Sequence, residues 1–210
     1  MFHPFAALRK SGYTAIADPI YIVFEGDSLT ANDTYPLRAV AGLGADYRRI
    51  NVAAGGETWT QMQTARAAQC DPYIAANHCT ILSIWAGIND MVHVPNSPTL
   101  TTTVLGRLQS YVTAAKAAGW PLVVVYTLTP CGDALVDAQY ETERLSYNTQ
   151  LRAGYAGWGA DGLVDPGGDA TIGDVANVGN TSWFTDALHL TTAGQNIVGD
   201  LATAVLAGLV

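Results

Sequence analysis

A serine that follows a short apolar run is the first residue with a clear chemical use. Residues 20–24 are all apolar and lead through an acid into Gly26, Asp27 and Ser28. Such a run is typical of a buried parallel strand, and its turn would set the Ser28 hydroxyl at the strand's carboxyl end, where open α/β sheets bind ligands. Because Gly-Asp-Ser is also ordinary turn chemistry, Ser28 gains a functional interpretation only from partners elsewhere in the chain.

An acid and a histidine near the end of the chain could be those partners. Asp186 and His189 are three residues apart, just before a predicted helix. At this spacing the carboxylate can hold the tautomer of the imidazole while the second ring nitrogen faces Ser28 and removes its proton. The two side chains could instead bind a metal, but no second His or Cys cluster completes such a site. We therefore expect neither a metal nor a cofactor.

Two further turns carry hydrogen-bond donors. Acyl transfer places a negative charge on an oxygen, which fixed donors must stabilise. The N–H groups of Ser28 and Gly56 and the side-chain amide of Asn89 would supply three donors at one sheet edge, with the adjacent Gly55 as an alternative to Gly56. Asp27 and Asp90 are expected to bind backbone amides and fix their turns.

Strands and helices alternate along the chain. No hairpin dipeptides separate them, which favours a parallel sheet covered on both faces. The residues between 165 and 186 are rich in Gly, Asp and Asn and predict a long, functional loop. Strands are expected at residues 20–24, 47–52, 79–86 and 122–126, and helices at 35–41, 59–69, from 100 to a cap at Gly119, at 136–152, and from Thr192, where Gln195 completes a capping-box pattern.

Composition predicts a single domain over residues 1–210. Of these residues 49% are hydrophobic and 13% charged, enough to bury one core. The net charge of -8 and the absence of a basic stripe argue against a nucleic-acid partner. The first ten residues do not resemble a secretory signal, and the apolar C-terminus is too short to span a membrane. We expect no membrane insertion and a cytoplasmic protein by default, unless a leader has been trimmed.

Three cysteines leave the redox state open. Cys70 and Cys79 could pair across a short loop, which would leave Cys131 alone. An odd number does not suggest a disulfide framework, and small buried thiols are common.

The spacing of these motifs resembles a known family. Gly26-Asp27-Ser28-Leu29, the glycine at 56, Gly87-Ile88-Asn89-Asp90 and Asp186-Ala187-Leu188-His189 match, in order, the four blocks of the SGNH (GDSL) hydrolases. The resemblance implies a three-layer α/β/α sandwich with a flavodoxin-like, five-stranded parallel sheet. It also implies Ser28 as nucleophile, His189 as base, Asp186 as its orienting acid, and an oxyanion hole of Ser28, Gly56 and Asn89. We prefer Gly56 to Gly55 because it directly precedes Glu57-Thr58, as the family glycine precedes a polar residue and Thr.

Aromatic residues near the motifs could contact the substrate. Trp59, Trp183 and Phe184 could form pocket walls or simply pack in the protein, and His93 could touch substrate or solvent.

The predicted function is hydrolysis of short-chain carboxylic esters through an acyl-serine intermediate. O-acetyl groups on carbohydrate or small soluble esters are the expected substrates. A long-chain lipase or lysophospholipase, a thioesterase and an acyltransferase are alternatives within the family. A catalytically inactive carbohydrate-binding module is an alternative of another class. The sequence leaves the oligomeric state open.

Overall fold

A parallel β-sheet forms the middle layer of the protein. The computed structural model describes residues 19–74, 80–92, 100–132 and 139–210. Its five strands lie in the order β2-β1-β3-β4-β5, and every neighbouring pair is parallel. The strands are β1 (Ile20–Gly26), β2 (Tyr47–Asn51), β3 (Thr80–Trp85), β4 (Leu122–Tyr126) and β5 (Gly162–Val164).

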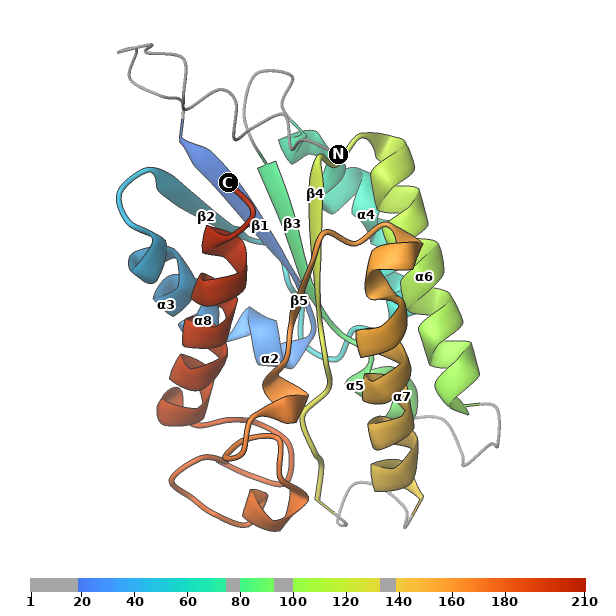
Figure 1. Ribbon diagram of the computed structural model, residues 1–210, viewed down its shortest axis with the longest axis vertical. Coiled ribbons are helices and arrows are strands. Elements are labelled where there is room, and N and C mark those ends of the chain that lie inside the picture. The colour runs from blue at the N-terminus through green and yellow to red at the C-terminus, as the bar shows by residue number, and fades with distance from the viewer. Residues whose placement is uncertain (1–18, 75–79, 93–99, 133–138) are drawn as a thin grey trace.

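Helices cover both faces of this sheet (Figure 1). On one face α3 (Thr34–Leu43) packs against α8 (Thr192–Ala207). On the other face α6 (Leu100–Ala118) packs against α4 (Trp59–Gln69) and α7 (Tyr140–Gly154). This confirms the predicted three-layer α/β/α sandwich. The shorter elements are α2 (Ser28–Ala31), α5 (Ile88–Val92), η1 (Asp71–Tyr73), η2 (Tyr155–Trp158), η3 (Pro166–Gly168) and η4 (Val175–Asn177).

The carboxyl ends of the strands gather the predicted site segments. In Figure 1 the short helices α2 and α5 and the loop between β5 and α8 lie at the lower end of the sheet. Strands β1 and β3 end in register, with Gly26 beside Trp85. A Cβ atom on Gly26 would lie 2.2 Å from the carbonyl oxygen of Trp85, so only glycine allows the two backbones to approach this closely. The turn that carries Ser28 is thereby held against the neighbouring strand.

The start of the last helix differs from the predicted capping box. The N-cap is Thr191, whose hydroxyl accepts a hydrogen bond from the N–H of Gly194, so the expected cap at Thr192 is wrong by one residue. Gln195 instead donates its amide to the carbonyl oxygen of Leu29. Its side chain is used to bind α8 to α2, because the buried carbonyl group needs a partner.

Two of the three cysteines lie in the described part of the chain. Cys70 and Cys131 are free and buried, while Cys79 lies outside the described residues.

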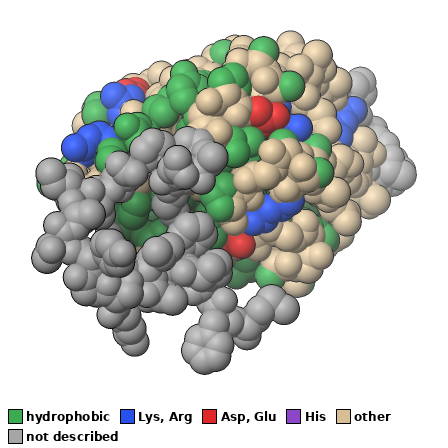
Figure 2. Space-filling view, turned by 90° about the horizontal axis from the view of Figure 1, so that it is seen from above, with side chains coloured by type: hydrophobic (Ala, Val, Ile, Leu, Met, Phe, Trp, Pro, Cys, Tyr) green, Lys and Arg blue, Asp and Glu red, His purple; other side chains and the backbone are tan. Residues whose placement is uncertain are grey.

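Figure 2 shows one face of the molecule, on which basic and acidic side chains are interspersed. None of the helices in the described ranges combines the length and hydrophobicity needed to cross a membrane.

The side chain of Glu25, in β1, is a fully buried carboxyl group. It accepts a hydrogen bond from the hydroxyl of Tyr111. Burial raises the pKa of Glu25 from its ordinary 4.5 to about 7, because desolvation disfavours the charged form more than hydrogen bonds from Tyr111 and Cys70 favour it. The folded protein therefore holds a proton here that the unfolded chain releases.

This buried acid is expected to make the protein less stable as pH rises. Its contribution to the free energy of unfolding is fully present below pH 4.5 and is lost as pH rises through about 7, because the folded state binds more protons in that window. The loss is on the order of 3 kcal/mol. Urea unfolding at several pH values should show a weaker pH dependence for Glu25→Gln than for the unchanged protein. Equal pH dependences would contradict this account.

Candidate active site

Ser28 begins the one-turn helix α2, directly after β1. Asp27 is its N-cap, and its side chain accepts a hydrogen bond from the N–H of Leu29 at 3.0 Å. Asp27 therefore fixes the turn, as its sequence context predicts. The N–H groups in the first turn of a helix have no partner within the helix, so that of Ser28 is well placed to bind an anion.

Three side chains that are far apart in the sequence meet at this turn. The Oγ atom of Ser28 lies 2.9 Å from Nε2 of His189, and Nδ1 of His189 lies 2.7 Å from Oδ2 of Asp186. The second carboxylate oxygen of Asp186 accepts hydrogen bonds from the N–H groups of Leu188 at 2.7 Å and His189 at 2.6 Å. One carboxylate thus fixes both the backbone and the ring of the histidine.

The charge of Asp186 sets the tautomer of that ring. Burial alone would raise the pKa of Asp186, but hydrogen bonds from the N–H and ring of His189 and from the N–H of Leu188 outweigh it and hold the pKa below its ordinary value. An ionised carboxylate only accepts hydrogen bonds, so Nδ1 of His189 must carry the proton. Nε2 is then free to accept the proton of the Ser28 hydroxyl.

A second carboxyl group near the serine behaves differently. Asp27 is fully buried, and desolvation raises its pKa to about 7, with the hydrogen bond from Leu29 offsetting only part of the effect. It faces its own turn, whereas Asp186 binds the imidazole. The two acids near His189 are therefore distinguished by their surroundings, and only Asp186 orients the ring.

The two remaining predicted donors belong to the turns after β2 and β3. Gly56 has a φ of 80°, a conformation that favours glycine. A Cβ atom on the adjacent Gly55 would lie 3.9 Å from Cβ of Ser28, so this glycine turn lies beside the serine. Asn89 is buried in α5, and its Nδ2 donates to the carbonyl oxygen of Glu57 at 3.0 Å. Because an amide nitrogen carries two hydrogens, one remains for an oxyanion. The choice of Gly56 over Gly55 stays a prediction.

Replacement of Asn89 by alanine is expected to reduce kcat about 10² to 10³-fold, because the predicted oxyanion donor would act on charge that develops only in the transition state. KM should change much less than kcat. Esterase kinetics with p-nitrophenyl acetate test this, and Asn32→Ala is a matched control because Asn32 is exposed and its oxygen caps only the N–H of Thr34. A rise in KM with unchanged kcat would contradict a role in oxyanion binding.

Asp90 connects the Asn89 turn to the glycine turn. Its carboxylate is buried and accepts hydrogen bonds from the N–H of Trp59 at 2.9 Å and from Nη1 of Arg107 at 2.7 Å. Asp90 therefore binds a backbone amide, as predicted, but of another turn. The partner Arg107 was missed, because nothing in the local sequence links an arginine of α6 to an acid of α5 that lies 17 residues before it.

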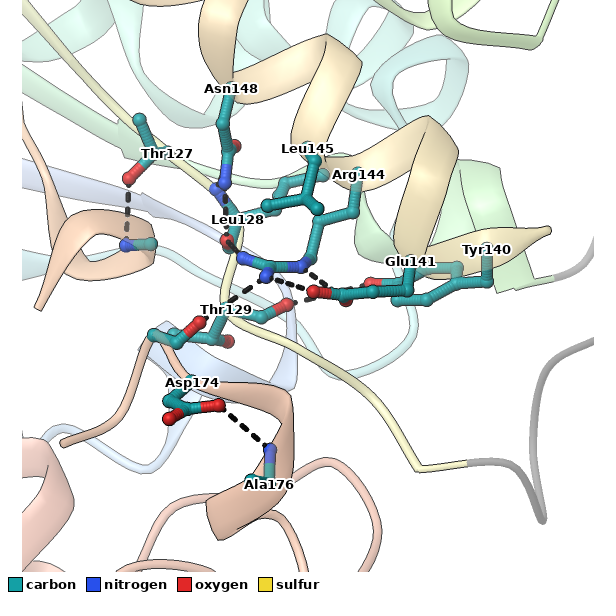
Figure 3. Close-up of polar contacts among 12 residues, drawn as sticks. Thr127, Leu128, Thr129, Tyr140, Glu141, Arg144, Leu145, Asn148, Asp174 and Ala176 are labelled. Carbon is teal, nitrogen blue, oxygen red and sulfur yellow. Dashed lines mark hydrogen bonds and ion pairs between the residues drawn. The ribbon is translucent and has the colours of Figure 1, made fainter. Parts of the chain in front are cut away.

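A buried arginine supports the loop that carries Asp186. Arg144 in α7 pairs with Glu141 through two nitrogens and donates to the carbonyl oxygens of Leu128 and Gly173. Figure 3 shows the guanidinium pointing from α7 towards the segment after β4, where Asn148 also binds Leu128. Arg144 and Asn148 are four residues apart on α7, so their side chains lie on the same face of this helix.

The predicted aromatic contacts divide between two regions. Trp59 is 1% exposed and packs against Tyr111 with ring centroids 5.5 Å apart, which favours a packing role over substrate contact. Phe184 lines a pocket beside Asp186, and Trp183 is half-buried against the core. His93 lies outside the described residues. Among the described residues, no group of His, Cys, Asp or Glu side chains has the arrangement of a metal site.

Comparisons with known proteins identify the family and the fold. The model of the GDSL-like lipase/acylhydrolase family matches residues 24–197. A search of curated proteins finds no match. A lipolytic protein of the G-D-S-L family from Veillonella parvula is similar in structure, with a TM-score of 0.71, 17% identity, and coverage of 89% of this chain and 97% of that chain. An acetylxylan esterase from Geobacillus stearothermophilus gives a TM-score of 0.68, 16% identity, and coverage of 89% and 93%.

A third similar structure is the lipase/acylhydrolase from Enterococcus faecalis, with a TM-score of 0.64, 16% identity, and coverage of 90% of this chain and 95% of that chain. At these identities the structural likeness establishes the fold, whereas the family model spans most of the sequence, including Ser28 and His189. The four sequence blocks, the α/β/α sandwich and the family match agree, and the chain belongs to the GDSL-like lipase/acylhydrolase family.

Proposed function

We propose that the protein is a serine esterase that hydrolyses short-chain carboxylic esters, with O-acetyl groups on carbohydrate or small soluble esters as its substrates. The observation that carries the proposal is the continuous hydrogen-bonded series from Ser28 through His189 to Asp186, with distances of 2.9 and 2.7 Å. A serine hydroxyl is a weak nucleophile until a base removes its proton, and this arrangement supplies an oriented base.

The reaction follows from that arrangement in two steps. Oγ of Ser28 attacks the ester carbonyl while Nε2 of His189 takes the hydroxyl proton, and the resulting oxyanion accepts hydrogen bonds from the N–H groups of Ser28 and Gly56 and from Asn89. His189 then gives its proton to the departing alcohol, which leaves an acyl group on Ser28. In the second step His189 removes a proton from water, which attacks the carbonyl carbon of the acyl-serine. The bond from that carbon to Oγ of Ser28 then breaks, His189 returns its proton to Oγ, and the carboxylic acid is released.

The preference for a short acyl group rests on the segments around Ser28. In the described part of the chain these are turns and short helices such as α2 and α5, without the long apolar helix that could cover an extended acyl chain. The similarity in fold to an acetylxylan esterase is compatible with acetyl substrates.

A series of p-nitrophenyl esters from acetate to octanoate tests the acyl preference. We expect kcat/KM to decline beyond about four carbons, because each added methylene must find apolar surface in the site. A maximum at octanoate would refute the short-acyl proposal and favour a lipase. Release of acetate from a panel of acetylated polysaccharides would then identify the alcohol half of the substrate.

A further inference from the structure

A pocket of about 400 Å³ lies next to Asp186, between the segment after β4 and the loop before α8. Its lining includes the backbone of Gly132, on which a Cβ atom would lie 3.1 Å from Cγ1 of Val178, and the apolar side chains of Val175, Val178 and Phe184. Pockets of this size accommodate small organic groups. Val175 is 41% exposed although it is apolar, so filling the pocket would remove its side chain from water.

The position of this pocket relates it to one half of an ester. His189 lies between Ser28 and Asp186, joined to them by hydrogen bonds of 2.9 and 2.7 Å. Nε2 returns the proton to the leaving oxygen, so the alcohol half of the ester must depart beside the imidazole. The pocket borders the loop that carries this imidazole, whereas the predicted oxyanion donors Gly56 and Asn89 come from the turns after β2 and β3.

The side chains that separate Ser28 from the pocket, His189 and Asp186, are partly exposed to solvent. The side chain of His189 is 39% exposed and that of Asp186 is 52% exposed, so a group attached to the leaving oxygen can pass over their edge. The acyl half of the ester is attached to the carbonyl carbon and has no need to approach His189.

The charge of the lining restricts the occupant. Among the described lining residues, Asp186, whose pKa is held low, is the one ionisable residue, and the others are apolar or carry only hydroxyl or backbone groups. The carboxylate of Asp186 would repel an anionic group, and none of the lining residues that the structure describes is basic. We propose that this pocket, the alcohol pocket, binds the uncharged, ring-sized alcohol moiety of the ester through an apolar face. The proposal rests on the proposed esterase function.

Substitution of Val175 by tryptophan tests the alcohol pocket by filling it. The ratio of kcat/KM for benzyl acetate to that for methyl acetate should fall about tenfold in Val175→Trp. Leu37→Trp is the matched control, because Leu37 is an exposed apolar residue on α3, outside the pocket, and should leave the ratio unchanged. The substitution Val178→Ala enlarges the pocket. It should change the benzyl acetate to methyl acetate ratio of kcat/KM and leave the ethyl butyrate to ethyl acetate ratio unchanged.

Equal effects on benzyl and methyl acetate, or effects that follow the acyl group instead of the alcohol, would overturn the assignment. Direct binding separates this outcome from failure of the esterase proposal. Benzyl alcohol should bind to the Ser28→Ala variant, as measured by ligand-observed NMR, and should lose that binding when Val175→Trp is added. Binding that survives the added tryptophan would also reject the alcohol pocket, whether or not any ester is hydrolysed.

Discussion

Replacement of Ser28 by alanine is expected to reduce kcat for p-nitrophenyl acetate about 10⁵ to 10⁶-fold, because it removes the proposed nucleophile, which would carry the acyl intermediate. The residual rate would come from the oxyanion donors and from binding alone. Ser28 is half-buried, and the hydrogen bond of its hydroxyl is made to His189, so the variant should unfold at nearly the same temperature as the unchanged protein.

A second serine provides the matched control for this measurement. Ser110 on α6 is exposed and its hydroxyl bonds the carbonyl oxygen of Gly106, so Ser110→Ala should keep full activity. An organofluorophosphonate should label the unchanged protein at Ser28 and should not label Ser28→Ala. If Ser28→Ala kept more than about a hundredth of the activity, the acyl-serine mechanism would be wrong, since loss of a nucleophile cannot be that mild.

Local patterns predicted much of the fold correctly. The strand that precedes Ser28 was recognisable as an apolar run, and helix α4 occupies the residues expected from its start at Trp59. The family resemblance implied a fifth strand, but the sequence did not show where it lies. Strand β5 (Gly162–Val164) is too short to show an alternation of apolar and polar residues. Local patterns identify elements that are long or strongly apolar, and they fail for short elements held by tertiary pairing.

The sequence predicted the residues of the candidate site more completely than the side chains that hold those residues in place. Ser28, Asn89, Asp186 and His189 occur in short motifs whose spacing can be read directly. The supporting contacts connect different elements, such as Asp90 with Arg107, and depend on which helix crosses which turn. The spacing of residues in a single sequence does not show which helix packs against which turn. The residues proposed to take part in the reaction were therefore identified before those that hold them in place.

Replacement of Asp186 by asparagine is expected to reduce kcat about 10⁴-fold, even though the two side chains have the same shape. One carboxylate oxygen accepts hydrogen bonds from the N–H groups of Leu188 and His189, so the oxygen of the asparagine amide must stay on that side. The amide nitrogen then faces Nδ1 of His189 and donates to it. The ring must carry its proton on Nε2, and it can no longer accept the proton of Ser28.

The same loop contains a control for this substitution. Asp174 also accepts a hydrogen bond from a backbone N–H two residues later, that of Ala176, as Figure 3 shows. The hydrogen bonds of His189, in contrast, are made to Asp186 and Ser28. Asp174→Asn should therefore keep nearly full kcat. Circular dichroism should show both variants folded. Equal losses in the two variants would mean that the loop needs its charges for folding, and the orienting role of Asp186 would be wrong.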